Sequence, residues 1–120
     1  MTYQKRIGRL GEALASEYLK GLGYQFLDQN YHTRYGELDL VFLDEDSIVF
    51  AEVKTRTSSA FGSPESSITT AKIEHIQDAA LLWLQDHPDT QDDWRIDVIA
   101  ILLDSKGNPK DIQHFINVNL

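Results

Sequence analysis

Two carboxylates lie on two apolar runs in the central third of the chain, in a pattern that could bind a metal ion. The runs, residues 38–43 and 48–53, flank an acidic segment at residues 44–47. Apolar, β-rich runs on either side of a polar turn are typical of a β-hairpin. If the turn is centred in the acidic segment, facing residues have numbers that sum to 91. Asp39 on the first strand then opposes Glu52 on the second.

Side chains alternate along a strand, so Glu37, Asp39, Glu52 and Lys54 should share one face of the hairpin. The other face is apolar and carries Leu38, Leu40, Phe42, Val49, Ala51 and Val53. Directly opposed carboxylates destabilise a sheet when both are charged. A shared proton, a neighbouring cation such as Lys54, or a bound divalent metal would offset the repulsion. Because the acids also have apolar neighbours on their own face, we favour a site over a solvated surface.

The composition predicts one soluble domain over residues 1–120, with 42% hydrophobic and 25% charged residues. The sequence has no cysteine, so a metal site must use carboxylates, carbonyls or histidine. No apolar stretch approaches the roughly 18 residues of a membrane span. The N-terminus leads into an amphipathic segment, without the apolar core of a signal peptide. We therefore expect a cytoplasmic protein.

The net charge of −8 argues against a general electrostatic grip on nucleic acid. The charge is unevenly distributed, however. Residues 1–72 hold 8 basic and 10 acidic residues, whereas residues 73–120 hold 3 basic and 9 acidic residues. If a metal ion neutralises carboxylates of the hairpin, the first part becomes locally basic and can contact a phosphate backbone.

Periodic apolar residues predict two helices that flank the hairpin. The first covers residues 4–22, with an apolar stripe of Ile7, Leu10, Leu14, Tyr18 and Leu22, and Gly23 as a stop. Glu12 lies at the margin of that stripe, where small neighbours would let another element approach it. The second helix runs from about residue 70 to residue 85, and we expect an N-cap with a following proline already at residues 63–65.

The remaining segments predict three further strands. One lies within residues 24–33, where residues 28–30 should begin a turn. The second, residues 94–103, is almost uninterruptedly apolar, which is typical of a strand covered on both sides. Its Asp97 should pair with Arg95 or with a neighbouring strand. The third, residues 112–118, is edge-like. The order α-β-β-β-α-β-β predicts an α/β fold with a mixed sheet flanked by helices.

One set of segments resembles the PD-(D/E)xK nuclease superfamily, and archaeal Holliday-junction resolvases in particular. It comprises Leu-Gly-Glu-Ala-Leu-Ala on the first helix, Gly-Glu-Leu-Asp-Leu on the first hairpin strand and Phe-Ala-Glu-Val-Lys-Thr-Arg on the second. More closely, the chain looks like the YraN-like family of small bacterial proteins. The resemblance spans Gly8 to about Ala100 and implies a restriction-endonuclease-like core, αβββαβ, followed here by an extra C-terminal strand.

The resemblance also implies roles for individual residues. Asp39 and Glu52 match the metal ligands, the carbonyl of Val53 would complete the metal shell, and Lys54 matches the lysine that positions the attacking water. Glu12 matches an acid that resolvases carry on the first helix. Leu38 departs from the proline of the superfamily name. Glu37 has no clear counterpart, and by geometry it would hold Lys54 or join the acidic site. The basic residues that could contact phosphates are Arg9, Arg34, Arg56 and Lys72.

These features together predict an endonuclease that uses Mg²⁺ or Mn²⁺ and acts on branched or junction-like DNA. Resolvases commonly act as dimers, so the resemblance implies a homodimer. Two alternatives stay open at this point: a non-catalytic nucleic-acid-binding module that keeps the nuclease fold, and a protein-interaction domain that uses the acidic C-terminal part.

Overall fold

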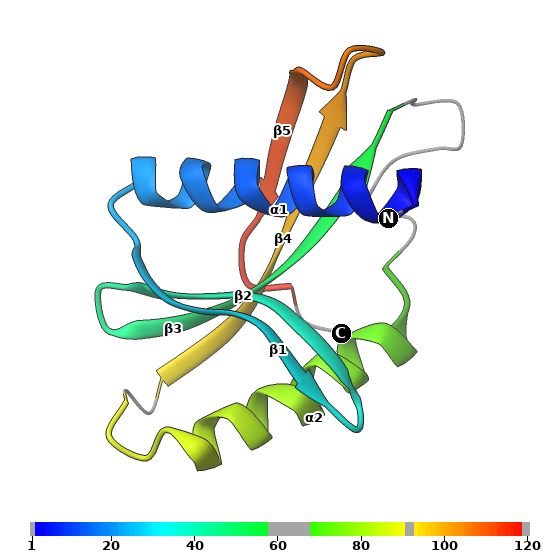
Figure 1. The fold of residues 1–120 in the computed structure, drawn as a ribbon. Coiled ribbons are helices and arrows are strands. Elements are labelled where there is room, and N and C mark those ends of the chain that lie inside the picture. The colour runs from blue at the N-terminus through cyan, green and yellow to red at the C-terminus, as the bar shows by residue number, and fades with distance from the viewer. Residues whose placement is uncertain (1, 58–67, 91–92, 119–120) are drawn as a thin grey trace.

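A five-stranded mixed sheet separates two helices in the computed structural model, which describes residues 2–57, 68–90 and 93–118. The elements in chain order are α1 (Tyr3–Gly21), β1 (Gln25–Thr33), β2 (Gly36–Asp44), β3 (Ser47–Arg56), α2 (Thr70–Asp86), β4 (Asp93–Leu103) and β5 (Pro109–Phe115). The predicted α/β fold and the order α-β-β-β-α-β-β are confirmed (Figure 1).

The strands lie in the order β1-β2-β3-β4-β5. Only β3 and β4 run parallel, and every other neighbouring pair is antiparallel. Helix α1 packs on one face of the sheet and α2 on the other (Figure 1). Strand β4 contributes buried side chains to both faces, as its apolar sequence predicted, and β5 is an edge strand.

The β2–β3 hairpin has the predicted register near its turn. Leu43 pairs with Ile48 and Val41 with Phe50. The turn itself consists of two residues, and Glu45 takes a positive φ of 53° there. The hairpin therefore brings Asp39 and Glu52 toward each other as expected.

One side chain lies on the other face from the one predicted. Leu38 packs in the core cluster under α2 with Val41 and Phe50, whereas Leu40 packs under α1. On the N-terminal side of Leu40, β2 remains paired with β1 but no longer pairs with β3. Two-stranded ribbons twist more strongly than wider sheets. The strand end can therefore rotate, and Leu38 turns toward α2.

Helix α1 starts at a capping threonine and ends before a glycine. The Thr2 hydroxyl accepts a hydrogen bond from the Lys5 amide, and Gly23 takes a φ of +92°. The buried line of the helix differs from the predicted stripe: Leu10 and Leu22 are exposed, and the buried residues are Gly11, Ala15, Ser16 and Leu19. The small residues on this line allow α1 to lie close to the sheet.

Helix α2 starts at Thr69, whose hydroxyl accepts a hydrogen bond from the Lys72 amide at 3.1 Å. Its buried residues are Ile73, Ile76, Ala79, Ala80 and Trp83. The N-cap expected at residues 63–65 lies outside the described residues. Neither described helix is long and apolar enough to cross a membrane.

Two expected boundaries need correction. Residues 28–30 do not begin a turn, because β1 continues to Thr33. Asn30 takes a positive φ of 49° within the strand, a conformation that asparagine tolerates better than most residues, and the register with β2 shifts between Phe26 and Asp28. The last strand spans Pro109–Phe115 and ends three residues earlier than predicted.

Candidate metal and phosphate site

The candidate site lies where β2 and β3 separate. Their ladder ends at the pair Leu40–Ala51, while β2 stays paired with β1 and β3 stays paired with β4 as far as Arg56. Figure 1 shows β3 running away from the β1–β2 ribbon beyond this point. The Val53 amide, which would otherwise have no partner across the ladder, donates a hydrogen bond to Asp39 Oδ2 at 2.9 Å. Because the strands separate here, the Asp39 carboxylate takes the place of the β2 carbonyl that would accept this bond in a continuous ladder.

Asp39 and Glu52 form a pair of interacting carboxyl groups that line the same cavity of about 510 Å³. Glu52 is 6% exposed, and Asp39 is partly buried. Burial and the negative charge of Glu52 raise the pKa of Asp39 to about 8, although the bond from the Val53 amide acts in the opposite direction. In the metal-free protein the protonated form of Asp39 is therefore favoured more strongly than in a free aspartate. We refer to Asp39 and Glu52 as the carboxylate pair.

Two lysines contact the carboxylate pair from different elements. Lys72 Nζ, from the first turn of α2, lies 2.9 Å from Glu52 Oε1, and Lys54 Nζ, from β3, lies 3.9 Å from the same oxygen. Burial and the adjacent Lys72 ammonium lower the pKa of Lys54. Burial also disfavours the charged form of Lys72, but its hydrogen bonds with Lys54 and Glu52 raise its pKa. The charge of Lys72 is thus fixed by Glu52, while Lys54 loses its proton more readily.

Glu12 reaches the edge of the site from α1. A Cβ atom at the preceding Gly11 would lie 1.8 Å from Thr55 Oγ1, so only a glycine lets α1 approach β3 this closely. Asn30 Nδ2 donates a hydrogen bond to Glu12 Oε1 at 2.9 Å. Burial raises the pKa of Glu12, and the negative charges of Glu37 and Glu52 add to the effect.

Oxygen atoms supply the donors available to a metal ion here. Among the described residues, no group of three or more His, Cys, Asp or Glu side chains converges on a common point. The carboxylate pair therefore supplies the principal oxygen donors, and Glu12 lies at the edge of the site. Hard divalent cations such as Mg²⁺ prefer oxygen donors and are commonly held by one or two carboxylates together with substrate phosphates. The residues present fit such an ion.

Glu37 does not hold Lys54 as geometry had suggested. Within the described ranges, its ion pair is with His32, whose Nε2 lies 4.0 Å from Glu37 Oε1. Glu37 also lines both the cavity of the carboxylate pair and a second cavity of about 690 Å³ beside α1. Glu37 therefore lies between these two cavities.

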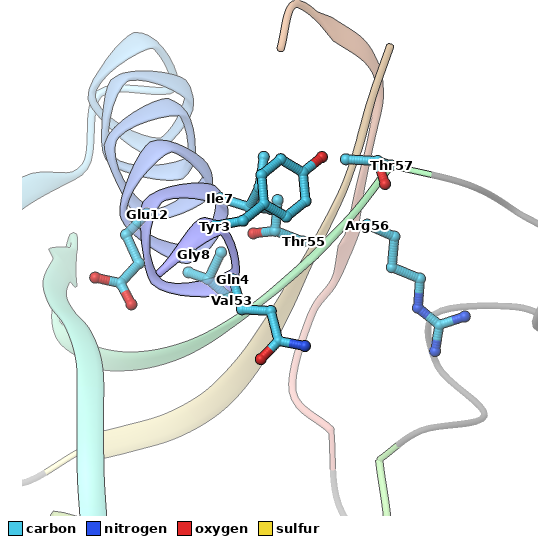
Figure 2. Close-up of a pocket in the computed structure, with 9 residues that line it drawn as sticks. All are labelled: Tyr3, Gln4, Ile7, Gly8, Glu12, Val53, Thr55, Arg56 and Thr57. Atoms are coloured by element: carbon cyan, nitrogen blue, oxygen red, sulfur yellow. The ribbon is translucent and has the colours of Figure 1, made fainter. Parts of the chain in front are cut away.

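The other residues predicted to contact phosphates lie at different cavities around the site. Arg9 lines the second cavity with Lys5 and Glu12. Arg34 stacks on the ring of Tyr35, a residue that lines the cavity of the carboxylate pair. Arg56 lines a third cavity, about 360 Å³, together with Glu12 and Val53 (Figure 2). Of the four basic residues predicted to contact phosphates, Lys72 alone touches the carboxylate pair in the described structure.

A second polar cluster, centred on Asp97, lies between β4 and β5. Asp97 is fully buried and accepts hydrogen bonds from Arg95 and from the Asn117 amide, and it pairs with His114 Nε2 at 2.8 Å. Burial opposes the charge of Asp97, but its bonds to His114 and Arg95 hold its pKa below the usual range. The predicted pairing of Asp97 with Arg95 is confirmed, and this cluster is part of the framework that fixes β4.

Asn30 and His114 have contacts that the sequence pattern did not reveal. Asn30 positions Glu12 through a residue pair eighteen positions apart, and His114 joins Asp97 to the hydroxyl of Tyr18. For Lys72, the sequence did contain a sign of an acidic partner. A lysine three residues after a capping threonine opposes the helix dipole, which is unfavourable without an acidic partner.

Comparison with known protein families identifies the chain. Residues 11–101 match the model of a family described as "Uncharacterised protein family UPF0102". A UPF0102 protein of Syntrophomonas wolfei is 48% identical over 94% of this chain and 96% of its own length. One from Arthrobacter is 42% identical over 90% of this chain and 91% of its own, and one from Vibrio parahaemolyticus is 44% identical over 82% of each. The family match includes the carboxylate pair, both lysines and Glu12, and the chain belongs to the UPF0102 family.

Proposed function

We propose that this chain is a divalent-metal-dependent endonuclease that hydrolyses phosphodiester bonds in branched or junction-like DNA. The observation that carries the proposal is the carboxylate pair at the separation of β2 and β3, with two lysines on Glu52. The resemblance to PD-(D/E)xK nucleases, and to Holliday-junction resolvases among them, supports the choice of reaction and substrate. The observed element order is also that of their αβββαβ core, with β5 added.

Mg²⁺ or Mn²⁺ is the cofactor that the donor set suits best. Asp39, Glu52 and the carbonyl of Val53 would hold it. When bound, such an ion lowers the pKa of a coordinated water and offsets negative charge on the phosphoryl oxygens. The raised pKa of Asp39 supports this assignment, because two adjacent carboxyl groups need a positive charge between them before both can ionise.

The lysines supply positive charge from the protein itself. Lys54, beside the carboxylate pair, would orient the attacking water and stabilise the negative charge that develops on the phosphate. Lys72 would leave Glu52 when a metal ion neutralises that carboxylate, and its ammonium group would then contact the phosphate. Lys72 would thus neutralise Glu52 in the metal-free protein and bind the substrate phosphate in the metal-bound protein.

Glu12 and the surrounding arginines complete the proposed site. Glu12, held by Asn30, would orient a water molecule or the metal shell from the α1 side. Arg9, Arg34 and Arg56 border the three cavities and would contact phosphates along the DNA. Such contacts set the register of the DNA without reading its sequence, as expected for an enzyme that recognises structure. A homodimer would present two such sites to the two strands at a junction.

A nuclease assay tests this function directly. Linear, nicked, flapped and four-way-junction DNA would be incubated with the protein and Mg²⁺ or Mn²⁺, and Glu52→Ala would serve as the control. We expect cleavage of branched substrates that requires metal and disappears in Glu52→Ala. Metal-independent DNA binding without cleavage would indicate a binding module, and binding of neither metal nor DNA would indicate a protein-interaction domain. Either result would overturn the proposal.

A further inference from the structure

A small cavity with mixed polar and apolar walls lies next to the carboxylate pair, between the first turns of α1 and the end of β3. Its volume is about 360 Å³, at the lower end of the range for ligand pockets. Figure 2 shows Tyr3 and Ile7 of α1 beside Thr55 of β3, with Gln4 and Glu12 pointing away from them. We call it the Tyr3 pocket. Its function is not explained by metal binding, because the carboxylate pair lines a different cavity.

The Tyr3 pocket lies near the site, although it shares no lining residue with the cavity of the carboxylate pair. Val53, which follows Glu52 directly in β3, forms part of its wall. Glu12 and Gly8 line both this pocket and the cavity beside α1, and Glu37 lines both that cavity and the cavity of the carboxylate pair. A polynucleotide with a phosphate at the carboxylate pair therefore has a neighbouring nucleotide within reach of the Tyr3 pocket.

The walls of the pocket suit a flat group with polar edges. Ile7 and Val53 provide apolar surface, and Tyr3 is a large aromatic residue that is 60% exposed. Among the described residues, the side chains of Gln4 and Thr57 show no hydrogen-bond partner, so their amide and hydroxyl groups can bind a ligand. An aliphatic side chain of a protein partner would bury these groups without satisfying them. A nucleobase offers donors and acceptors on its edge and a face that stacks on tyrosine.

We propose that the Tyr3 pocket receives one unpaired nucleobase next to the scissile phosphate. The proposal rests on the proposed nuclease function and narrows its substrate class. A base within continuous duplex has its edge paired and its faces stacked, and it must leave the helix to enter such a pocket. The pocket would therefore select DNA in which a nucleotide is already unstacked, such as a branch point, a flap or a single-stranded end.

The glycines of α1 provide a matched pair of variants. A Cβ at Gly8 or at Gly21 would have no heavy atom within 4 Å, so the fold accepts a larger residue at either position. Gly8 lines the Tyr3 pocket, whereas Gly21 ends the helix at its other end. Leucine at Gly8 would occupy the space that a base needs. Gly8→Leu is thus the test variant and Gly21→Leu the control.

The probes are two oligonucleotides that differ only in their bases: an eight-nucleotide oligothymidylate and an eight-residue abasic oligonucleotide. Both carry the same phosphates, so a difference in affinity reports contacts to bases. Binding would be measured by fluorescence anisotropy at low salt with Ca²⁺, which also takes carboxylate oxygens. We expect the wild-type protein to bind the oligothymidylate about 5- to 150-fold more tightly, as one stacked base contributes. Gly8→Leu should abolish this preference, and Gly21→Leu should retain it.

Each contrary result has a definite meaning. Equal affinity of the wild-type protein for both probes, a preference that survives Gly8→Leu, or no binding of either probe overturns the base pocket. The nuclease assay distinguishes failure of the base pocket from failure of the proposed nuclease function. Glu52-dependent cleavage of a four-way junction, without a base preference, would support the nuclease function and contradict the base pocket. A base preference that Gly8→Leu abolishes, without any cleavage, keeps the pocket and removes the nuclease.

Discussion

Lys72 Nζ lies 2.9 Å from Glu52 Oε1, and this ion pair connects the start of α2 to the centre of the sheet. Lys72 stands in the first turn of α2, where the helix dipole disfavours a positive charge. Glu52 is almost fully buried, where an unpaired carboxylate is costly. Each residue thus offsets the unfavourable position of the other. Such departures from local preference concentrate at functional sites.

Replacing Lys72 should destabilise the metal-free protein and leave the metal-bound protein less affected. Lys72 is 39% exposed and Lys54 remains beside Glu52, so we expect Lys72→Met to lower the free energy of unfolding by only about 1 kcal/mol. Mg²⁺ should restore most of this loss, because it supplies positive charge at Glu52. Urea denaturation with and without Mg²⁺ measures both effects. The control is Lys110→Met, at an exposed position of β5; an equal loss in both variants would contradict the argument.

The stability of the metal-free protein should depend on Asp39 above neutral pH. The folded-state pKa of Asp39 is raised to about 8 from an ordinary value of 3.8, so between these values the folded protein binds a proton that the unfolded chain releases. Stability should therefore fall as the pH rises toward 8. Asp39→Asn keeps an acceptor for the Val53 amide and removes the charge. We expect it to melt several degrees above the wild-type protein at pH 9, and to lose Mg²⁺ binding. A lower melting temperature at that pH would contradict the assignment.

Lys54 and Glu52 should separate catalysis from metal binding. Lys54→Ala removes an ammonium group near the proposed phosphate but no metal donor, so we expect a loss of cleavage rate of about 10²- to 10⁴-fold with Mg²⁺ affinity retained. Calorimetric titration with Mg²⁺ and a single-turnover cleavage assay measure the two properties. Glu52→Ala should lose both. Cleavage at the wild-type rate by Lys54→Ala would show that the lysine has another function.

The buried cluster at Asp97 should govern stability without affecting cleavage of DNA. Asp97→Ala leaves Arg95 and His114 without their shared carboxylate, and breaking a buried pair in this way costs about 3–5 kcal/mol. The pKa of Asp97 is lowered in the folded protein, so its contribution is present above pH 3.8 and is lost as the pH falls. Denaturation curves at pH 7 and at about pH 2.5, which lies below the ordinary pKa of an aspartate, measure this. The variant should cleave DNA normally at temperatures where it stays folded.

The hairpin and the site acids were predictable because their pattern is local and repetitive. Alternation over residues 38–53 set the register, which the structure keeps as far as the pair Leu40–Ala51 and which brings Asp39 near Glu52. The separation of β2 and β3 was not predictable, since it depends on how each strand pairs with its other neighbour. Leu38 was assigned to the wrong face for this reason. Likewise, the contact of Lys72 with Glu52 depends on the placement of α2, which no spacing in the sequence encodes.

The inward face of α1 was predicted less well, and the reason is physical. Leu10 and Leu22 fit an apolar stripe by spacing, yet both are exposed, and the helix instead buries the small residues Gly11, Ala15 and Ser16. A prediction from periodicity assigns the large apolar residues to the buried face. Close packing of a helix on a sheet instead requires small residues at the contact. The close approach of Gly11 to Thr55 decides the orientation of α1 and hence the position of Glu12.

Two glycines of α1, three residues apart, should respond in opposite ways to alanine. At Gly11 the new methyl group would lie 1.8 Å from Thr55 Oγ1, so Gly11→Ala should destabilise the protein by about 1–3 kcal/mol through overpacking. At Gly8 a methyl group meets no atom within 4 Å, and Gly8→Ala should stabilise the helix by about 0.5–1 kcal/mol. Urea denaturation of both variants measures the difference.

The same pair tests whether the packing of α1 controls the site. Thr55→Ala removes the hydroxyl that obstructs the new methyl group, so the double variant with Gly11→Ala should lose less stability than the sum of the single changes. Gly11→Ala should also reduce cleavage at temperatures where it is folded, because a displaced α1 moves Glu12 away from Asn30. If Gly11→Ala were as stable and as active as the wild-type protein, α1 would not lie on β3 as described, and the assignment of Glu12 to the site would fail with it.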